Sequence, residues 1–212
     1  MQGIPLNERK RLGALLDDRP QAEVMAMIPQ FSQAETDNFV APPAQIPEAL
    51  GVLMFNMERG VNLPEIQEFL RDCPDIQPFD VILANELDDG CARSGNKNTA
   101  RELAQAFGLN YAWGLEFIEL VNDENAKGFH GNAVFSRWPI RRAGVIRLPE
   151  QYNWYFDRQK RIGGRLAVFA ELDVGGQPVG AVSIHLENRT HGEGRKAQMA
   201  AILEAVRKEL PD

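Results

Sequence analysis

The sequence has few cysteines and no long apolar run. Only Cys73 and Cys91 occur among 212 residues, which rules out a disulfide scaffold. Neither lies near the second cysteine or histidine pair that a zinc site needs. No apolar stretch approaches the roughly 18 to 20 residues of a membrane-spanning helix, and the amino terminus lacks the apolar segment of a signal peptide. We therefore expect a soluble, cytoplasmic protein.

Positive charge is also scarce. The sequence holds 23 Lys+Arg against 30 Asp+Glu, a formal net charge of −7, which argues against sequence-blind wrapping of DNA because that mode needs many cations. Hydrophobic residues make up 44% of the chain, enough for the core of one domain. Two short helical patterns run into closely spaced prolines, so we predict a helical, proline-containing extension over residues 1–46 and a domain over residues 47–212. No obligate protein partner is indicated.

From residue 50 onward the hydrophobic pattern alternates between the periods of strands and helices. Continuous apolar runs predict buried strands over residues 50–55 and 79–84, and the polar residues 85–90 predict a turn. Helices are expected from Pro64, from Thr99 and over residues 194–210. Further strands are expected over residues 111–118, 131–136, 144–148, 165–174 and 179–186. This order predicts an α/β domain with mixed sheets.

Three polar residues stand at or near the ends of apolar strands: Asn56, Glu86 and His185. Strand ends in layered α/β folds converge on one edge, where ligands commonly bind. Each residue also has an ordinary structural explanation, since a strand-end Asn commonly forms a turn, a Glu caps a backbone or pairs with an Arg, and a single His belongs to the core. His130 and His191 lie beside glycines in polar stretches and are expected at the surface.

The three residues belong to a series of sequence blocks spread over about residues 50 to 200. The blocks are Val52–Glu58, Asp80–Leu87, Gly131–Ile140, Gly164–Val168 and Val182–Glu187, followed by Arg195 and Gln198 on the last predicted helix. In residues and order they resemble the endonuclease/exonuclease/phosphatase superfamily, the DNase I-like metal-dependent phosphoesterases. The resemblance implies part of a four-layer α-β-β-α sandwich with mixed sheets, its carboxy-terminal half missing.

The resemblance also implies roles for individual residues. Glu86 matches the principal Mg²⁺ ligand, and its hard carboxylate oxygen suits Mg²⁺ or Mn²⁺. Asn56 matches the asparagine that orients the scissile phosphate or the metal shell. His185 matches the strand histidine that donates to a phosphate oxygen, and Arg165 matches a phosphate-gripping arginine. We expect His185, Asn56 and Arg165 to be catalytic, and Glu86 with Asn56 to hold the metal.

Substrate-binding residues are less sharply indicated. Asn132, Arg137 and Arg93 are the candidates, Asn132 also being suited to a supporting role and Arg93 to a capped turn. Arg137 opens a stretch, residues 137–165, with eight basic and two acidic residues and interleaved aromatics. Such a stretch can grip phosphate and stack a base, which would suit nucleic acid among other phosphoester substrates. An equally weighted alternative is a solvated charged hairpin whose aromatics lie in the core.

One part of the family pattern is missing. The sequence contains neither the Gly-Asp-x-Asn strand motif, whose Asp activates water, nor the terminal Asp-His pair. We therefore expect a fragment of a Mg²⁺-dependent phosphoester hydrolase, nearly inactive and poorly folded alone. The alternative is a non-catalytic member of the same fold that binds a phosphate ligand or a protein. A serine hydrolase using Ser136 is remote because no Gly-x-Ser-x-Gly elbow is present.

Overall fold

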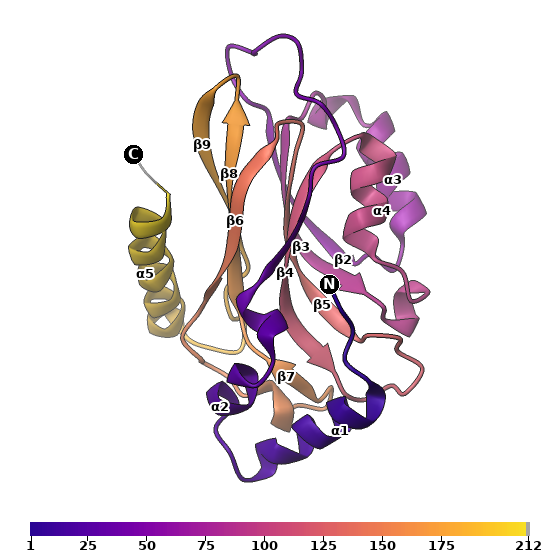
Figure 1. Ribbon diagram of the computed structural model, residues 1–212, viewed down its shortest axis with the longest axis vertical. Helices are drawn as coiled ribbons and strands as arrows, with labels where there is room; N and C mark the ends of the chain where they lie inside the picture. Colours follow the sequence, from indigo (N-terminus) through magenta and orange to yellow (C-terminus); the bar gives the residue numbers. More distant parts are fainter. Residues whose placement is uncertain (211–212) are drawn as a thin grey trace.

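Nine strands form two sheets that pack face to face in the computed structural model, which describes residues 1–210 (Figure 1). The larger sheet has the order β1-β4-β5-β3-β2, with β7 paired to β4, and the smaller sheet has the order β6-β8-β9. The strands are β1 (Ala34–Asp37), β2 (Val52–Arg59), β3 (Val81–Asp89), β4 (Asn110–Glu119), β5 (Phe129–Ser136), β6 (Ile140–Arg147), β7 (Arg161–Gly163), β8 (Leu166–Val174) and β9 (Gln177–Ile184). Only β2 and β3 pair in parallel among these strands. The larger sheet is thus mixed and the smaller one antiparallel, and the α/β architecture confirms the predicted fold class.

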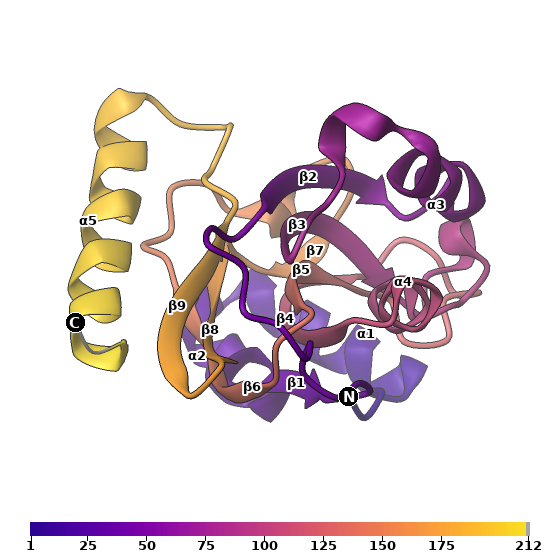
Figure 2. The ribbon, with the colours of Figure 1, turned by 90° about the horizontal axis from the view of Figure 1, so that it is seen from above.

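Five α-helices accompany the sheets among the described residues. They are α1 (Leu6–Ala14), α2 (Gln21–Ala26), α3 (Leu63–Asp72), α4 (Thr99–Phe107) and α5 (Gly192–Glu209). α1 and α2 lie at one end of the sandwich (Figure 1). α3 and α4 lie on the larger sheet and α5 on the smaller one, so four layers follow one another (Figure 2). Within residues 1–210, no helix combines the length and the apolar character needed to cross a membrane.

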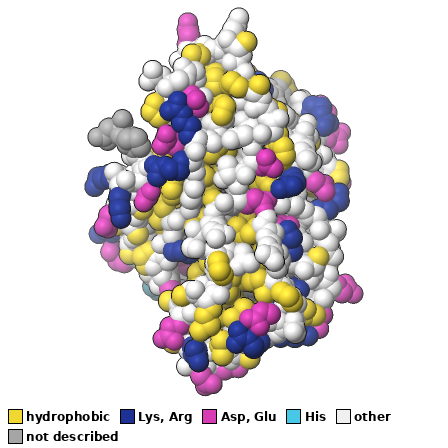
Figure 3. All heavy atoms as spheres, viewed as in Figure 1, with side chains coloured by type: hydrophobic (Ala, Val, Ile, Leu, Met, Phe, Trp, Pro, Cys, Tyr) yellow, Lys and Arg dark blue, Asp and Glu magenta, His cyan; other side chains and the backbone are white. Residues whose placement is uncertain are grey.

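The core between the sheets follows the two-residue period of the strands. In β8, Leu166, Val168 and Ala170 are buried against the larger sheet, while Ala167 and Phe169 are buried under α5. Successive side chains of a strand point to opposite faces, so a strand buried on both faces reads as one apolar run. On the face seen in Figure 3, basic and acidic side chains of the described residues are interspersed without a continuous basic tract.

Two predictions about the first strands were wrong. β2 was expected to be buried, yet Val52 is 55% and Met54 72% exposed. Among the described residues the smaller sheet ends at β9, which lies opposite β3, so no strand covers this face of β2. The predicted turn over residues 85–90 is instead the second half of β3, which continues past an irregularity between Ala84 and Leu87 to Asp89.

The amino-terminal segment packs on the same core as the sheets. It contains α1 and α2, and its β1 pairs antiparallel with β4. Leu16, Val24 and Phe31 are buried in one cluster with the larger sheet. The Arg147 guanidinium of β6 donates to the Phe31 carbonyl at 2.9 Å, which fixes the segment to the sandwich. The boundary after residue 46 stays a prediction, and the last two residues of the predicted domain, 211–212, lie outside the described residues.

We predict that Phe31→Ala lowers the free energy of unfolding by about 3–5 kcal/mol, because it empties a site in a core shared with the larger sheet. Chemical denaturation followed by circular dichroism measures the change. Phe156→Ala is the matched control, since the Phe156 side chain is 68% exposed and its loss should cost less than about 0.5 kcal/mol. Equally small effects of both substitutions would show that the amino-terminal segment contributes little to the core.

Candidate active site

A polar pocket of about 240 Å³ opens where the ends of β2, β3, β5 and β9 meet. Glu86 reaches its wall because β3 is irregular at that point. Glu86 adopts a left-handed backbone conformation, φ 59°, and its N–H donates to the Asn132 side-chain oxygen at 3.1 Å. A non-glycine residue in this conformation is strained, and the buried Asn132 holds it in place. Asn132 therefore fixes the backbone of Glu86, the candidate metal ligand.

Two cross-sheet hydrogen bonds bring His185 beside Glu86, although His185 itself does not line the pocket. The buried Ser183 hydroxyl of β9 donates to the Ala84 carbonyl of β3 at 3.0 Å, and the Asn85 amide donates to the Ile184 carbonyl at 3.2 Å. These bonds tie the end of β9 to the irregularity of β3. As a result, His185 Nε2 lies 3.8 Å from Glu86 Oε1, although the two residues come from different sheets.

The protonation pattern of His185 follows from its neighbour Arg165. Arg165 Nη1 lies 3.0 Å from His185 Nδ1. A guanidinium only donates, so Nδ1 must accept and the imidazole proton sits on Nε2. The 3.8 Å separation from Glu86 is too long for a hydrogen bond. The Nε2–H group is therefore available to a phosphate oxygen or a water molecule in the pocket.

Glu116 is a member of the site that the sequence analysis missed. This residue of β4 is fully buried, and its Oε1 lies 3.2 Å from Arg165 Nη1. Its Oε2 lies 3.7 Å from His185 Nδ1. Burial is the largest single influence and opposes its ionisation, but the charge of Arg165, together with His185 and His130, lowers the pKa of Glu116 to about 2. A glutamate inside an otherwise apolar strand was the available signal, because such a charge needs a buried partner.

A second buried network adjoins the pocket, which its member His130 lines. His130 Nδ1 donates to Asp88 at 2.9 Å, and Arg93 grips both oxygens of the same carboxylate at 2.7 Å. Arg93 also contacts Glu119 at 3.0 Å. Burial opposes ionisation of Asp88, yet the bonds from His130 and Arg93 lower its pKa to about 2. His130 is thus a buried residue and not the surface residue expected, because Asp88 satisfies it.

Comparisons with known proteins bear on the fold of this site. No protein-family model matches the chain, and no curated protein matches it. An endonuclease/exonuclease/phosphatase family protein from Leptotrichia buccalis C-1013-b matches at 20% identity and a TM-score of 0.50, over 74% of this chain and 63% of that protein. The chain has the endonuclease/exonuclease/phosphatase fold. The resemblance inferred from the sequence is confirmed at this level.

Two further solved structures match less well. Humanized D. rerio TDP2 with 14 mutations matches at 18% identity and a TM-score of 0.47, over 76% of this chain and 57% of its own. SmcL matches at 14% identity and a TM-score of 0.48, over 78% of this chain and 60% of its own. The chain thus spans 57% to 63% of the length of the three structures, less than two thirds of each.

The endonuclease/exonuclease/phosphatase fold brings most but not all of the predicted site residues together. Asn56 lies opposite Asn85 in the parallel pairing of β2 with β3, one residue from Glu86. Arg165 lines the pocket, whereas Arg93 is engaged by two carboxylates behind it. Arg137 lies beside Asp80, before the opposite end of β3, about 20 Å from Glu86 at the rise of a strand. Arg137 therefore does not join the substrate-binding set.

Three of the five aromatic residues of the basic stretch lie in the core. Trp138, Trp154 and Tyr155 are buried, whereas Phe156 is exposed and Tyr152 is half-buried. A base can stack only on a ring with a free face. The alternative with aromatics in the core therefore describes Trp138, Trp154 and Tyr155 but not Phe156.

The donor set can be tested against Mg²⁺. Within residues 1–210, no group of three or more His, Cys, Asp and Glu side chains is arranged to hold a metal ion. Mg²⁺ nevertheless needs few protein ligands, because it keeps several waters and is commonly bound by one or two carboxylates together with substrate phosphate. Glu86, whose side chain is 25% exposed at the pocket, provides one such carboxylate. The residues present therefore fit a largely hydrated ion.

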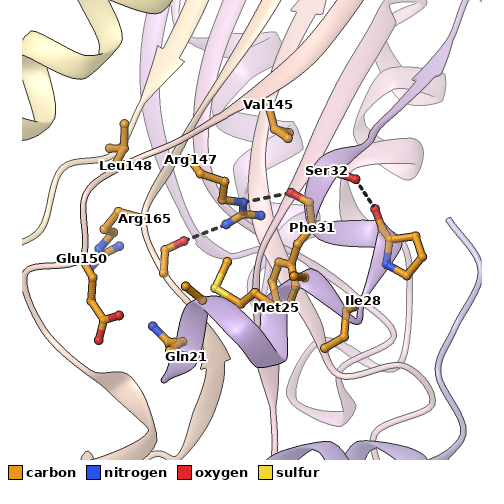
Figure 4. Close-up of a pocket in the computed structure, with 14 residues that line it drawn as sticks. Gln21, Met25, Ile28, Phe31, Ser32, Val145, Arg147, Leu148, Glu150 and Arg165 are labelled. Atoms are coloured by element: carbon orange, nitrogen blue, oxygen red, sulfur yellow. Dashed lines mark hydrogen bonds between the residues drawn. The ribbon is translucent and has the colours of Figure 1, made fainter. Parts of the chain in front are cut away.

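Another cavity, of about 580 Å³, is largely apolar and lies elsewhere (Figure 4). It separates α2 from β6, and Met25, Ile28 and Val145 line it. Glu86 and His185 do not border it, although Arg165 lines both cavities. Hydrolytic chemistry requires the acid–base and metal-binding groups, so the smaller pocket is the candidate active site.

We predict that the buried carboxylates of Glu116 and Asp88 no longer stabilise the fold in acid. Glu116 and Asp88 have folded-state pKa values of about 2, below their ordinary values of 4.5 and 3.8. The unfolded chain therefore takes up protons first as the pH falls, and stability present above about pH 4.5 is lost towards pH 2. For Glu116 this corresponds to about 3 kcal/mol. Denaturation curves at several pH values measure it.

Glu116→Gln separates this effect from general acid denaturation. The variant should be less stable than the wild type near pH 7, because Arg165 loses its buried partner, and its stability should fall less steeply in acid. Glu204→Gln, at an exposed residue of α5, should retain the wild-type slope. If the stability of the wild type and that of Glu116→Gln fell equally steeply in acid, the strongly lowered pKa assigned to Glu116 would be contradicted.

Proposed function

We propose that the protein is a metal-dependent phosphoester hydrolase in which water attacks a phosphate ester in the polar pocket. The observation that carries the proposal is the meeting of Glu86 Oε1 and His185 Nε2 at 3.8 Å, within a fold shared with an endonuclease/exonuclease/phosphatase family protein. A carboxylate open to a hard cation and a neutral imidazole N–H side by side suit a phosphate that bridges them.

Each residue of the pocket has a distinct task in this proposal. Glu86, assisted by Asn56, would hold Mg²⁺ or Mn²⁺, which would polarise the phosphate when bound. His185 donates its Nε2–H to a non-bridging oxygen, where charge develops during attack. Arg165 fixes the histidine tautomer through Nδ1, and Glu116 neutralises that arginine from behind. In this proposal Arg165 thus positions His185 in addition to contacting the phosphate, the role expected of it from the sequence.

Attack by water also requires a general base. Residues 1–212 contain no Gly-Asp-x-Asn motif, and we propose that the base lies outside them, on a strand that adds to the edge of β9. Two observations support this. Among the described residues β9 pairs only with β8, and Val52 and Met54 of the facing β2 are exposed. Without a base, residues 1–212 alone should be slower than the complete protein by about 10²–10⁴.

We predict that Glu86→Gln and His185→Ala each reduce Mg²⁺-dependent hydrolysis by the full-length protein at least about 100-fold. Glu86→Gln removes the metal-binding charge at nearly constant volume, and His185→Ala removes the phosphate donor. A panel of phosphodiesters and phosphomonoesters, assayed with and without Mg²⁺, supplies the substrate. Glu204→Gln, with an exposed side chain on α5, is the control and should be fully active. Undiminished activity in both site variants would refute the assignment.

The second candidate is a non-catalytic member of the fold that binds a phosphate ligand. It is favoured by the lack, in residues 1–210, of a multi-carboxylate metal group. The same panel distinguishes the two candidates. A binding protein would retain phosphate ligands without turning them over, whether or not Mg²⁺ or Mn²⁺ is added.

A further inference from the structure

Four arginines converge on the pocket beside Glu86. They are Arg59 at the end of β2, Arg161 at the start of β7, Arg165 before β8 and Arg189 after β9; together they form the arginine cluster. Only Glu86 and Asp157 contribute carboxylates to the same wall. The sequence separation of these residues means that the fold, and not a local basic run, brings the charges together.

The members of the cluster differ in how they are neutralised. Arg165 is paired with Glu116 and Glu187 at 3.2 and 3.3 Å, both behind the wall. In contrast, Arg59 has no acidic partner among residues 1–210. Arg189 lies 3.5 Å from Asp157, without a hydrogen bond from its guanidinium, and its side chain is 54% exposed. At the pocket, the Arg59 guanidinium therefore keeps its donors free for a ligand, and Arg189 is held only by the long contact with Asp157.

Arg161 is the third arginine and is paired with Glu119 at 3.0 Å. Burial lowers its pKa and Glu119 opposes that effect, while the nearby positive charge of Arg59 lowers the pKa further. Arg59 and Arg161 therefore place two like charges on the lining of one pocket. A bound anion between them would relieve this repulsion.

Trp154 holds three of the arginines in fixed positions. The guanidinium carbons of Arg161, Arg165 and Arg189 lie 5.1, 5.3 and 5.7 Å from its ring centre. The indole N–H donates to Glu187 at 2.8 Å, which fixes the ring itself. Stacked guanidinium groups lose little freedom when they bind, so the cluster is organised before a ligand arrives.

Backbone strain accompanies the free guanidinium of Arg59. Glu58 and Arg59 have φ values of 46° and 69°, and Gly60 follows at 68°. Non-glycine residues adopt this conformation at a cost, and such residues cluster at ligand-binding sites. The Asn56 side chain accepts from the Glu58 N–H at 2.9 Å and stabilises the bend. The bend ends β2 at Arg59, beside the pocket that this residue lines.

We propose that the arginine cluster binds a second phosphate group of the substrate, a phosphomonoester next to the ester that is cleaved between Glu86 and His185. This inference rests on the proposed function. A phosphomonoester carries close to two negative charges near neutral pH and accepts bidentate bonds from guanidinium groups. A volume of about 240 Å³ is smaller than the pockets that enclose drug-sized ligands and suits a compact dianion. The substrate is thus a bisphosphorylated molecule, either a small metabolite or a strand end that bears a terminal phosphate.

Binding can be tested without catalysis. Inorganic pyrophosphate is titrated into the full-length protein by isothermal calorimetry in EDTA, so that no metal contributes. We expect Arg59→Gln and Arg189→Gln each to weaken binding at least about tenfold. Arg207→Gln, at an exposed residue near the far end of α5, is the matched control and should leave the affinity unchanged. Equal affinities in the wild type and both pocket variants, or no binding to the wild type, would overturn the proposal.

A kinetic arm identifies the source of the second phosphate. The ratio of kcat/KM with and without that phosphate is measured on a dinucleotide with a 5′-terminal phosphate and on a small bisphosphate. For one of the two substrates, we expect kcat/KM of the wild type to be more than about ten times higher with the second phosphate than without it. In Arg59→Gln this ratio should fall at least about tenfold. Ratios near one for both pairs would overturn the proposal while leaving hydrolysis established. If pyrophosphate binding depends on the arginines but no ester is turned over, the anion site would be supported and the proposed hydrolase function would be refuted.

Discussion

The buried contact between Arg165 and Glu116 determines how the rest of the pocket is arranged. Arg165 Nη1 lies 3.2 Å from Glu116 and 3.0 Å from His185 Nδ1. Because the guanidinium cannot accept a hydrogen bond, it places the histidine proton on Nε2, the atom that faces Glu86. The ion pair thus connects a residue of the central β4 to the chemistry at the end of β9.

Stability alone does not explain so many buried charges at one end of the sandwich. Glu116, Asp88 and Glu119 are all buried, and each is matched by an arginine. Desolvating two ions is costly, and apolar residues of similar volume often give equal or greater stability. We infer that these pairs are kept because they fix the directions of His185, His130 and the pocket arginines. Interactions that hold a site before the ligand binds reduce the cost of binding.

The sequence allowed the proximity of Glu86 and His185 to be predicted, but not the groups that hold them. Glu86 and His185 follow long apolar strands, so their exposure at a shared edge could be anticipated. Glu116 and His130 could not be assigned, because their partners come from strands far away along the chain. The polar residues after Ala84 were mistaken for a turn for the same reason, since buried partners let β3 continue. Arg137 was misplaced because a local basic run does not reveal which end of a strand it occupies.

The neighbouring strands β2 and β3 are both irregular beside the polar pocket. β2 and β3 run parallel. The pairing of β2 with β3 is irregular between Asn56 and Arg59, and the pairing of β3 with β5 is irregular between Ala84 and Leu87. Each irregularity leaves a residue with positive φ, Arg59 at 69° and Glu86 at 59°, at a cost on the order of 1–3 kcal/mol each. Neither side chain is buried, so core packing does not offset that cost. Both side chains line one pocket with opposite charges, the pair of charges that a metal ion and a phosphate require together.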